Sequence, residues 1–450
     1  MLPRYTLKCL FLFCALIFFH TVTAQNCEVP TLTNGTFLHG NNVRALYAAS
    51  GSQLWDGSDS QFGIETNSMV LKTIFAQGLW MVGYDPAANI KLSATTYGAA
   101  NGESDYYPGP LPLVDNLPMT NPETCSNFDR AWSVFRYEIE AHQADFADNG
   151  IIDNPLPSII GWPGKGNPEF EAIYGFSLPE TDQGYAPFWD LDADGVYEPL
   201  SGEYPIEPKH QIIPEHMVWT IFNTYGNFAT DSGSANINPT EIQCLAWALN
   251  CTDNEQLNNT VFTNYTLIQR GIESYDSVRI GLWTDFDLGC YTDDYVGSAP
   301  ELNTYYAYNQ DNDDNNPCDQ GILGAGENPP VQAVTFLNRP LDNFIYANAG
   351  FGLPPGVGSP NTVIEYARLL SGRFIDGTPI TTGGSGYNPA STDEVAHAFP
   401  NNPNDSDGWS AFNESLPPSD WRSIGSTFIE HWEVGQVIEF DVAHSYFRAD

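Results

Sequence analysis

Carboxylates are the residues best suited to do chemistry in this chain, and the segment 281–338 holds ten of them without a single Lys, Arg or His. They occur in tight groups, such as Asp285 with Asp287 and Asp293 with Asp294. Carboxylate oxygens clustered in this way are hard ligands that suit a hard divalent cation. The segment therefore predicts Ca²⁺ binding, and the alternative interpretation is a hydrated acidic surface.

A second acidic segment, 166–208, also holds ten carboxylates and no basic residue, and it contains the sharpest local motif of the chain. Carboxylates alternate along Asp-Leu-Asp-Ala-Asp, and a glycine follows where a chain turns sharply around an ion. This spacing matches the first half of a calcium loop. The predicted metal-binding positions are Asp190, Asp192, Asp194, Val196, Glu198 and Glu203.

The motif departs from an EF-hand at its twelfth position, where Ser201 replaces the bidentate glutamate and Glu203 follows two residues later. Trp189 before the motif and Pro199 within it favour a loop over a helix-loop-helix hand. A series of Asx turns with solvated carboxylates is the structural alternative to a calcium loop.

A second candidate metal site follows a predicted strand. Asp285 and Asp287 project to the same side if that strand continues, and Asp293 with Asp294 could close the site after a short turn. The alternative is that these side chains cap turns by accepting hydrogen bonds from backbone N–H groups. Farther along, Asp311, Asp313 and Asp314 lie in an Asn-rich loop where simple hydration is expected, and residues 404–408 are expected to form an ordinary turn.

Motifs of known enzymes are missing from the sequence. It has no H-E-x-x-H, no G-x-S-x-G and no G-x-x-x-x-G-K. Paired carboxylates such as Asp285 and Asp287 would suit glycoside hydrolysis, and 11 Trp and 23 Tyr offer rings on which sugars stack. We therefore predict a non-enzymatic protein for adhesion, matrix or polysaccharide contact, with a secreted glycoside hydrolase as the alternative.

The N-terminus predicts export. Arg4 and Lys8 precede an apolar run over 9–19, and small residues follow at 22–24, which is the layout of a signal peptide over residues 1–24. We expect the mature protein to be secreted or to lie on the outer cell surface. No segment has the roughly 20 apolar residues of a membrane span. Sixteen basic residues against 56 acidic ones argue against binding to nucleic acid or to an anionic membrane.

Six cysteines follow the predicted signal peptide, and an even number in an exported chain indicates disulfides. Cys244 with Cys251 is the nearest pair, and Cys290 with Cys318 would cross-link the acidic segment 281–338. We predict these two bonds. None of the cysteines has the C-x-x-C spacing of a zinc or redox site.

The elements that must position these groups are mostly strands. Apolar residues alternate over 261–268, 277–283 and 437–447, which is typical of antiparallel sheets packed on one side. Together with many aromatic residues, Gly and Pro, this pattern predicts a mainly β protein with an antiparallel β-sandwich and long loops.

One notable helix is predicted at about 127–146, where apolar residues recur every three or four positions after a possible capping box. The domain division that we predict is an N-terminal β-rich region over 25–215, which contains this helix and the Asp-rich loop. A β-sandwich domain with acidic loops would follow over 216–450.

Several short motifs also recur in this order in one group of bacterial proteins. They are Trp55-Asp-Gly57, Gly78-Leu-Trp80 with Gly83, Pro108-Gly-Pro110, Trp162-Pro-Gly164 with Gly166-Asn-Pro168, Asp192-Ala-Asp-Gly-Val-Tyr197 with Gly202-Glu-Tyr-Pro205, Asn258-Asn-Thr260, and Trp283 through Gly297.

Over residues 55–447 the chain thus resembles large exported proteins of bacteria that use the type IX secretion system. The resemblance implies a surface or secreted protein, a calcium-type loop at 190–203, and no known catalytic residues. It also leads us to expect a C-terminal sorting domain after Asp450. This chain would then be a fragment without the part on which type IX export and surface anchoring depend.

Overall fold

The structure is a computed structural model that describes residues 26–66, 69–233, 237, 239–314, 318, 322–348 and 353–449. The predicted signal peptide, 1–24, lies outside the described residues. No helix in the described part of the chain is long and apolar enough to cross a membrane.

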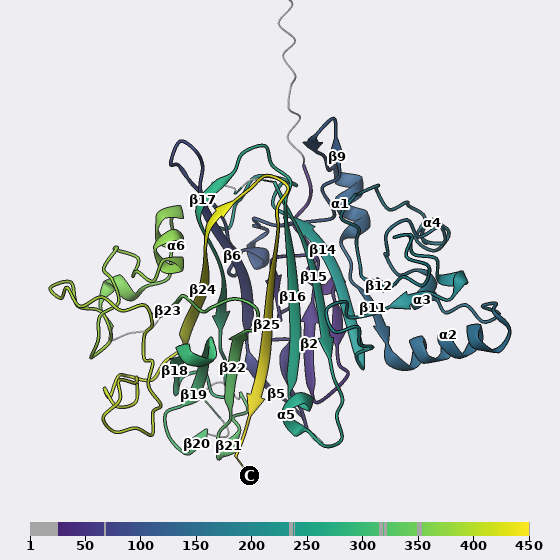
Figure 1. The fold of residues 1–450 in the computed structure, drawn as a ribbon. Helices are drawn as coiled ribbons and strands as arrows, with labels where there is room; N and C mark the ends of the chain where they lie inside the picture. Colours follow the sequence, from purple (N-terminus) through teal and green to yellow (C-terminus); the bar gives the residue numbers. More distant parts are fainter. Residues whose placement is uncertain are drawn as a thin grey trace, which may run out of the picture.

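The largest sheet contains nine strands within the described residues, in the order β11-β14-β15-β16-β25-β22-β19-β18, with β8 paired to β14 (Figure 1). Its neighbouring strands are antiparallel. The strands are β8 (Tyr107–Pro108), β11 (Trp132–Phe135), β14 (His216–Asn223), β15 (Thr240–Ala248), β16 (Thr260–Gln269), β18 (Asp294–Ala299), β19 (Thr304–Asn309), β22 (Val331–Phe336) and β25 (Val437–Phe447).

A second sheet, of six described strands, has the order β23-β24-β17-β6-β3, with β7 beside β6. Its members are β3 (Ser52–Gln53), β6 (Ala76–Tyr84), β7 (Ile90–Ser93), β17 (Tyr275–Asp285), β23 (Asn343–Asn348) and β24 (Trp421–Trp432). A smaller sheet joins β1 (Thr36–Leu38), β2 (Val43–Tyr47), β4 (Phe62–Glu65) and β5 (Val70–Ile74). Two-stranded ribbons join β9 (Leu113–Val114) with β10 (Leu117–Pro118), β12 (Phe188–Trp189) with β13 (Tyr204–Pro205), and β20 (Asp313–Asp314) with β21 (Gly326–Glu327).

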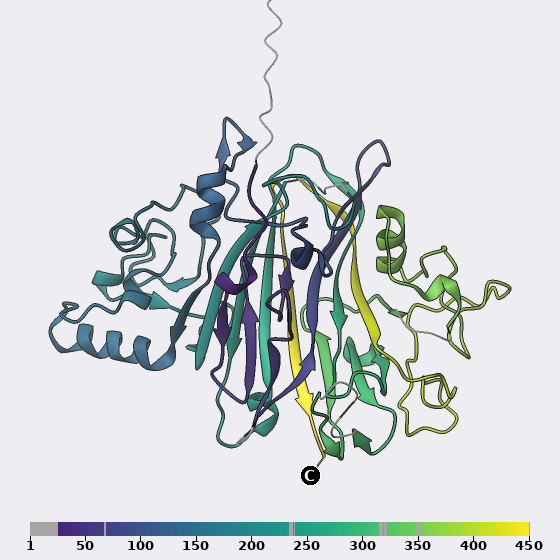
Figure 2. The same ribbon diagram turned by 180° about the vertical axis from the view of Figure 1, so that it is seen from behind.

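Most of the described helices lie at the two sides of these sheets, with α1 to α4 on one side and α6 on the other, whereas α5 lies at the lower end of β16 and β25 (Figures 1 and 2). They are α1 (Pro122–Phe128), α2 (Arg136–Asn149), α3 (Pro157–Ile160), α4 (Phe170–Tyr174), α5 (Glu255–Asn258) and α6 (Val363–Leu370). Short 3-10 turns are η1 (Leu32–Asn34), η2 (Gly98–Asn101), η3 (Pro199–Ser201), η4 (Pro300–Leu302) and η6 (Pro355–Val357).

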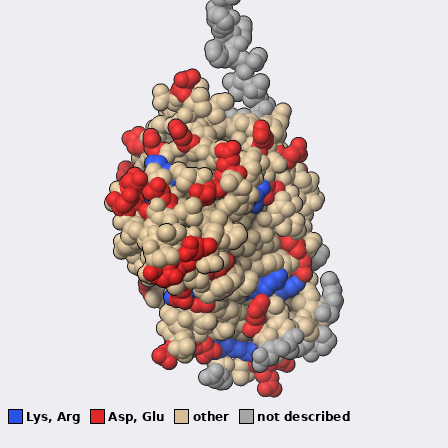
Figure 3. All heavy atoms as spheres, turned by 90° about the vertical axis from the view of Figure 1, so that its right-hand side faces the viewer, with Lys and Arg blue, Asp and Glu red and all other residues tan. Residues whose placement is uncertain are grey.

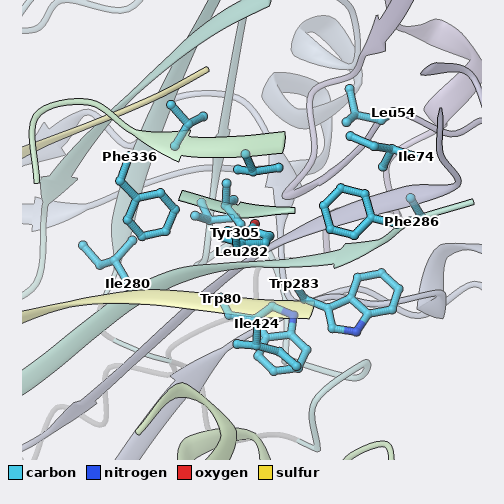
Figure 4. Packing of buried hydrophobic residues seen from close by; sticks show 14 of the residues in the cluster. Leu54, Ile74, Trp80, Ile280, Leu282, Trp283, Phe286, Tyr305, Phe336 and Ile424 are labelled. Carbon is cyan, nitrogen blue, oxygen red and sulfur yellow. The ribbon is translucent and has the colours of Figure 1, made fainter. Parts of the chain in front are cut away.

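The main core fills the space between the sheets (Figure 4). There, Tyr305 of β19 packs against Phe286 at the end of β17 with ring centroids 6.1 Å apart. On the opposite face of the six-stranded sheet, Trp80 of β6 and Trp283 of β17 stack with ring centroids 6.5 Å apart, and Tyr366 of α6 packs against Trp80. Full burial of each large apolar side chain contributes about 1.5–3 kcal/mol to folding. The predicted class, a mainly β protein with antiparallel sheets packed as a β-sandwich, is confirmed.

The outer face of the nine-stranded sheet is covered only in part. At β14, Val218 and Phe222 face the main core, whereas Met217, Trp219 and Ile221 face a second core beneath α2 to α4. This alternation buries β14 on both faces. At the other end of the sheet the outer face of β19 and β22 lines a groove instead.

The three predicted strands are confirmed as β16, β17 and β25, and Val261, Tyr265 and Leu267 of β16 do share the core face. Strands from both sides of residue 215 pair with each other, for example β6 with β17. The predicted domain boundary at 215 stays a prediction.

The predicted helix at 127–146 is wrong in its first half. Helix α1 ends at Phe128, residues 132–135 form β11, and only α2 from Arg136 onward is helical. Trp132 and Val134 alternate with half-buried neighbours, so this segment pairs with β14 and buries both side chains in the sheet. The helix begins where Glu138 Oε2 accepts a hydrogen bond from the N–H of Phe135 at 2.8 Å.

Two disulfides link described cysteines, Cys27 with Cys125 and Cys290 with Cys318. The prediction for Cys290–Cys318 is therefore confirmed, and the prediction for Cys244–Cys251 is wrong. Cys244 lies inside β15 with its side chain in the main core, while Cys251 lies beyond the end of that strand. Each extended residue advances about 3.3 Å, so the strand carries the two sulfurs apart.

Candidate functional site

The Asp-rich loop 190–203 is closed at its base by the short ribbon of β12 and β13. Trp189 pairs with Tyr204, and their rings stack with centroids 6.3 Å apart. The loop therefore leaves and re-enters the protein at one point, and its aspartates lie at the exposed end.

Backbone N–H groups organise the first turn of this loop. Asp190 accepts hydrogen bonds from Ala193 at 2.7 Å and Gly195 at 2.9 Å, and Asp194 accepts one from Val196 at 2.7 Å. Gly195 has a φ of +78°, a conformation that favours glycine. The Asx turns that formed the structural alternative are thus present. Each carboxylate oxygen has further lone pairs with which it could bind a cation.

Asp190, Asp192 and Asp194 each place one carboxylate oxygen within 4.8 Å of the others. Glu203 is only 1 % exposed, and its two oxygens accept hydrogen bonds from the N–H groups of Leu191 and Glu198 at 2.8 and 2.7 Å. Burial raises the pKa of Glu203, although these two bonds oppose the shift.

Glu203 therefore stabilises the loop from its buried side through these two hydrogen bonds. The structure groups the three aspartates and does not bring Glu198 or Glu203 into that group. Val196 contributes its N–H to Asp194.

The second predicted site lies at the end of β17. Asp285 pairs in register with Arg422 of β24, so the residue just before β24, Asp420, lies beside Asp285 and Asp287. These three carboxylates each place an oxygen within 4.8 Å of the others. They line a cleft of about 670 Å³ together with aromatic residues such as Tyr97 and Tyr291.

Basic residues already neutralise part of this cluster. Arg422 Nε lies 3.2 Å from Asp285 Oδ1, and Arg422 Nη1 lies 2.5 Å from Asp420 Oδ1. The Tyr97 hydroxyl donates to Asp285 and accepts from Arg422 at 3.0 Å. Lys72 also lines the cleft, where it pairs with Asp59.

Burial raises the pKa of Asp285 to about 7, against the opposing charge of Arg422. The pKa of Asp287 is raised well above its usual value by burial and then by the negative charges of Asp285 and Asp420. Without a cation, such a cluster resists full ionisation.

Asp293 and Asp294 do not join the group formed by Asp285, Asp287 and Asp420. Both are buried, and Asp294 Oδ2 accepts a hydrogen bond from the N–H of Leu288 at 3.0 Å, which fixes the turn after β17. Burial raises the pKa of Asp294 well above its usual value, and the nearby Asp293, Asp314 and Asp287 raise it further.

Asp314 corrects the expectation of a hydrated loop at 311–314. Its side chain is fully buried and accepts hydrogen bonds from the N–H groups of Cys290 and Ala325. It lies close to the Cys290–Cys318 disulfide, whose sulfurs are already bonded to each other. This carboxylate supports the turn as a structural residue. Asp311 and Asp313 remain exposed.

Asp420, Arg422 and Tyr97 are the functional candidates that sequence reasoning missed. No spacing relates them to Asp285, because 188 residues separate Tyr97 from Asp285 and the strand pairing alone brings Arg422 there. Pro417, Pro418 and Ser419 before Asp420 indicate only a turn ahead of a strand.

The surface carries the charge imbalance that the composition predicts. On the face that includes α1 to α4, Asp and Glu side chains far outnumber Lys and Arg (Figure 3). Comparison of the chain with protein-family models and with curated proteins found no match.

Proposed function

We propose that this is an exported, non-enzymatic protein of the cell surface or the secreted fraction. Its acidic loops bind Ca²⁺, and it serves adhesion, matrix or carbohydrate contact. The two disulfides among the described cysteines are in keeping with an oxidising, extracellular location.

The grouping of Asp190, Asp192 and Asp194 carries the calcium proposal. Three carboxylates lie within reach of one ion, and a buried glutamate holds the loop in shape from below. No Lys or Arg forms an ion pair with these aspartates in the described part of the chain. The Asp285 cluster has Arg422 as an internal counter-ion, so we assign it the weaker affinity.

Calorimetric titration of the chelated protein with Ca²⁺, with the melting temperature followed in parallel, tests this proposal. We expect heat of binding and an upward thermal shift. The variant Asp192→Asn/Asp194→Asn should lose the tighter site while it keeps the hydrogen bonds of Asp190.

A matched control is Asp405→Asn/Asp407→Asn, because these exposed aspartates have similar spacing but belong to no three-carboxylate group of the described residues. This control should bind calcium as the wild type does. Absence of both heat and thermal shift at millimolar calcium would remove the calcium proposal.

One observation favours a second candidate, a glycoside hydrolase. Asp285 and Asp287 share a cleft of about 670 Å³, and burial raises the pKa of both. A carboxyl group with a raised pKa suits a general acid. Sugar released from polysaccharides by the wild type and not by Asp287→Asn would support this candidate. Absence of release from a broad glycan set would reject it.

A further inference from the structure

A groove of about 660 Å³ lies on the outer face of the nine-stranded sheet, away from both acidic clusters. Its floor comes from β18, β19 and β22, where Tyr306 stands in register with Gly297 and Ala333. Its rim comes from the loop 400–412 and from Phe447 at the end of β25. The groove lies where α1 to α4 leave the sheet uncovered.

Aromatic rings are a main feature of this groove. The Tyr306 ring lies across Gly297, where an added Cβ would come within 2.9 Å of the ring. Tyr308 packs 5.7 Å from Tyr306, and its hydroxyl accepts a hydrogen bond from the N–H of Phe412 at 3.3 Å. Phe412 and Phe447 are nearly half exposed. A partly exposed ring in a groove offers a stacking surface to an apolar or sugar face.

The polar groups of the groove are mostly hydrogen-bond acceptors and amides. Asn309 lines the groove but is only 8 % exposed, and its Oδ1 is closed to solvent. Its Nδ2 donates to the carbonyl of Asp311 at 3.2 Å. Gln310, Asn402 and Asn404 add further amides.

The charge of the groove restricts its ligand. Glu301 and Asp311 line it, and no Lys, Arg or His does so among the described residues. An anionic ligand would meet two carboxylates without a counter-charge. A peptide that adds to the sheet edge is also disfavoured, because Ser298 of the edge strand β18 already donates its N–H to Phe399 at 3.1 Å.

We propose that this groove binds a neutral oligosaccharide, whose sugar faces stack on Tyr306 and Phe412 and whose hydroxyls donate to Glu301 and Asp311. The proposal goes beyond calcium binding. It rests on the proposed function only in that it names the site of carbohydrate contact, and it requires no metal ion.

Microarray screening and calorimetry with neutral hexasaccharides, namely cellohexaose, xylohexaose and laminarihexaose, test this proposal, with oligogalacturonate as the anionic comparison. Each is run in calcium and in EDTA. We expect at least one neutral hexasaccharide to bind in both buffers and oligogalacturonate to bind more weakly. Phe412→Ala should weaken binding by about tenfold.

The control is Phe228→Ala, because Phe228 is a more exposed aromatic residue that does not line the groove. This variant should bind as the wild type does, and melting temperatures confirm that each variant is folded. Failure of all neutral hexasaccharides to bind, preference for oligogalacturonate, loss of binding in EDTA, or unchanged binding by folded Phe412→Ala would each overturn the proposal. The calcium proposal is tested separately, by the heat of Ca²⁺ binding in the titration without sugar.

Discussion

Replacement of Arg422 by Gln should strongly destabilise the protein in EDTA. The side chains of Arg422 and Asp285 are 12 % and 3 % exposed, and their nearest N and O atoms lie 3.2 Å apart. Loss of one partner of a buried ion pair leaves the other charge unpaired, which costs about 3–5 kcal/mol. Arg422→Gln also loses the contact with Asp420.

Arg373 supplies a matched control. Its ion pair with Glu394 has almost the same length, 3.1 Å, but the two side chains are 42 % and 54 % exposed. Exposed pairs contribute about 0–1 kcal/mol, so Arg373→Gln should change stability little. Burial is thus the variable that separates the two substitutions.

Equilibrium unfolding in urea measures both variants through the midpoint and the slope. Asp285→Asn in the Arg422→Gln background should recover part of the loss, because Asp285 is then no longer a buried charge without a partner. Added calcium should stabilise Arg422→Gln more than the wild type, since the carboxylates of the Asp285 cluster no longer have their guanidinium. Equal losses for Arg422→Gln and Arg373→Gln would refute the reasoning.

Three further predictions concern the Asp-rich loop, the acidic cleft and the thiols. Each carboxylate oxygen of Glu203 accepts one backbone N–H bond, and Glu203→Gln leaves only one oxygen to accept them, so this variant should destabilise the loop by about 1.5–3 kcal/mol. Limited proteolysis near residue 195 should become faster, and an unchanged rate would contradict the supporting role of Glu203. The pKa of Asp285 is raised in the folded state to about 7, and that of Asp287 is raised well above its usual value. The protonated carboxyl groups therefore contribute their full share to the free energy of unfolding below about pH 4, and this contribution is lost as the pH rises toward 7. In EDTA, Asp287→Asn should therefore exceed the wild type in urea midpoint at pH 7.5 and lose that advantage at pH 4.5, whereas an advantage independent of pH would contradict the shift. Cys251 should react with iodoacetamide in the native protein and Cys244 only after unfolding, as read by mass spectrometry, and a Cys244–Cys251 disulfide in the digest would contradict this assignment.

Local pattern determined much of the fold. The alternation in 261–268, 277–283 and 437–447 predicts strands because neighbouring side chains on a strand face opposite sides of a sheet. The Asp-rich motif at 190–198 likewise predicts a compact acidic turn, because its aspartates and glycine act over a few residues. The strand alternation and the Asp-rich motif each lie within one short segment, so the sequence alone is enough to predict them.

Long-range pairing decided the rest. The pairing of Cys27 with Cys125 spans 98 residues, and only the packing of the N-terminal segment brings those sulfurs together. Residues 132–135 form a strand although their apolar spacing is helical, because they pair with β14 and gain its backbone hydrogen bonds. Asp420 and Arg422 reached Asp285 through the register of β24 on β17. Local spacing carries no information about such a register, so the composition of the acidic cleft was decided by the tertiary structure alone.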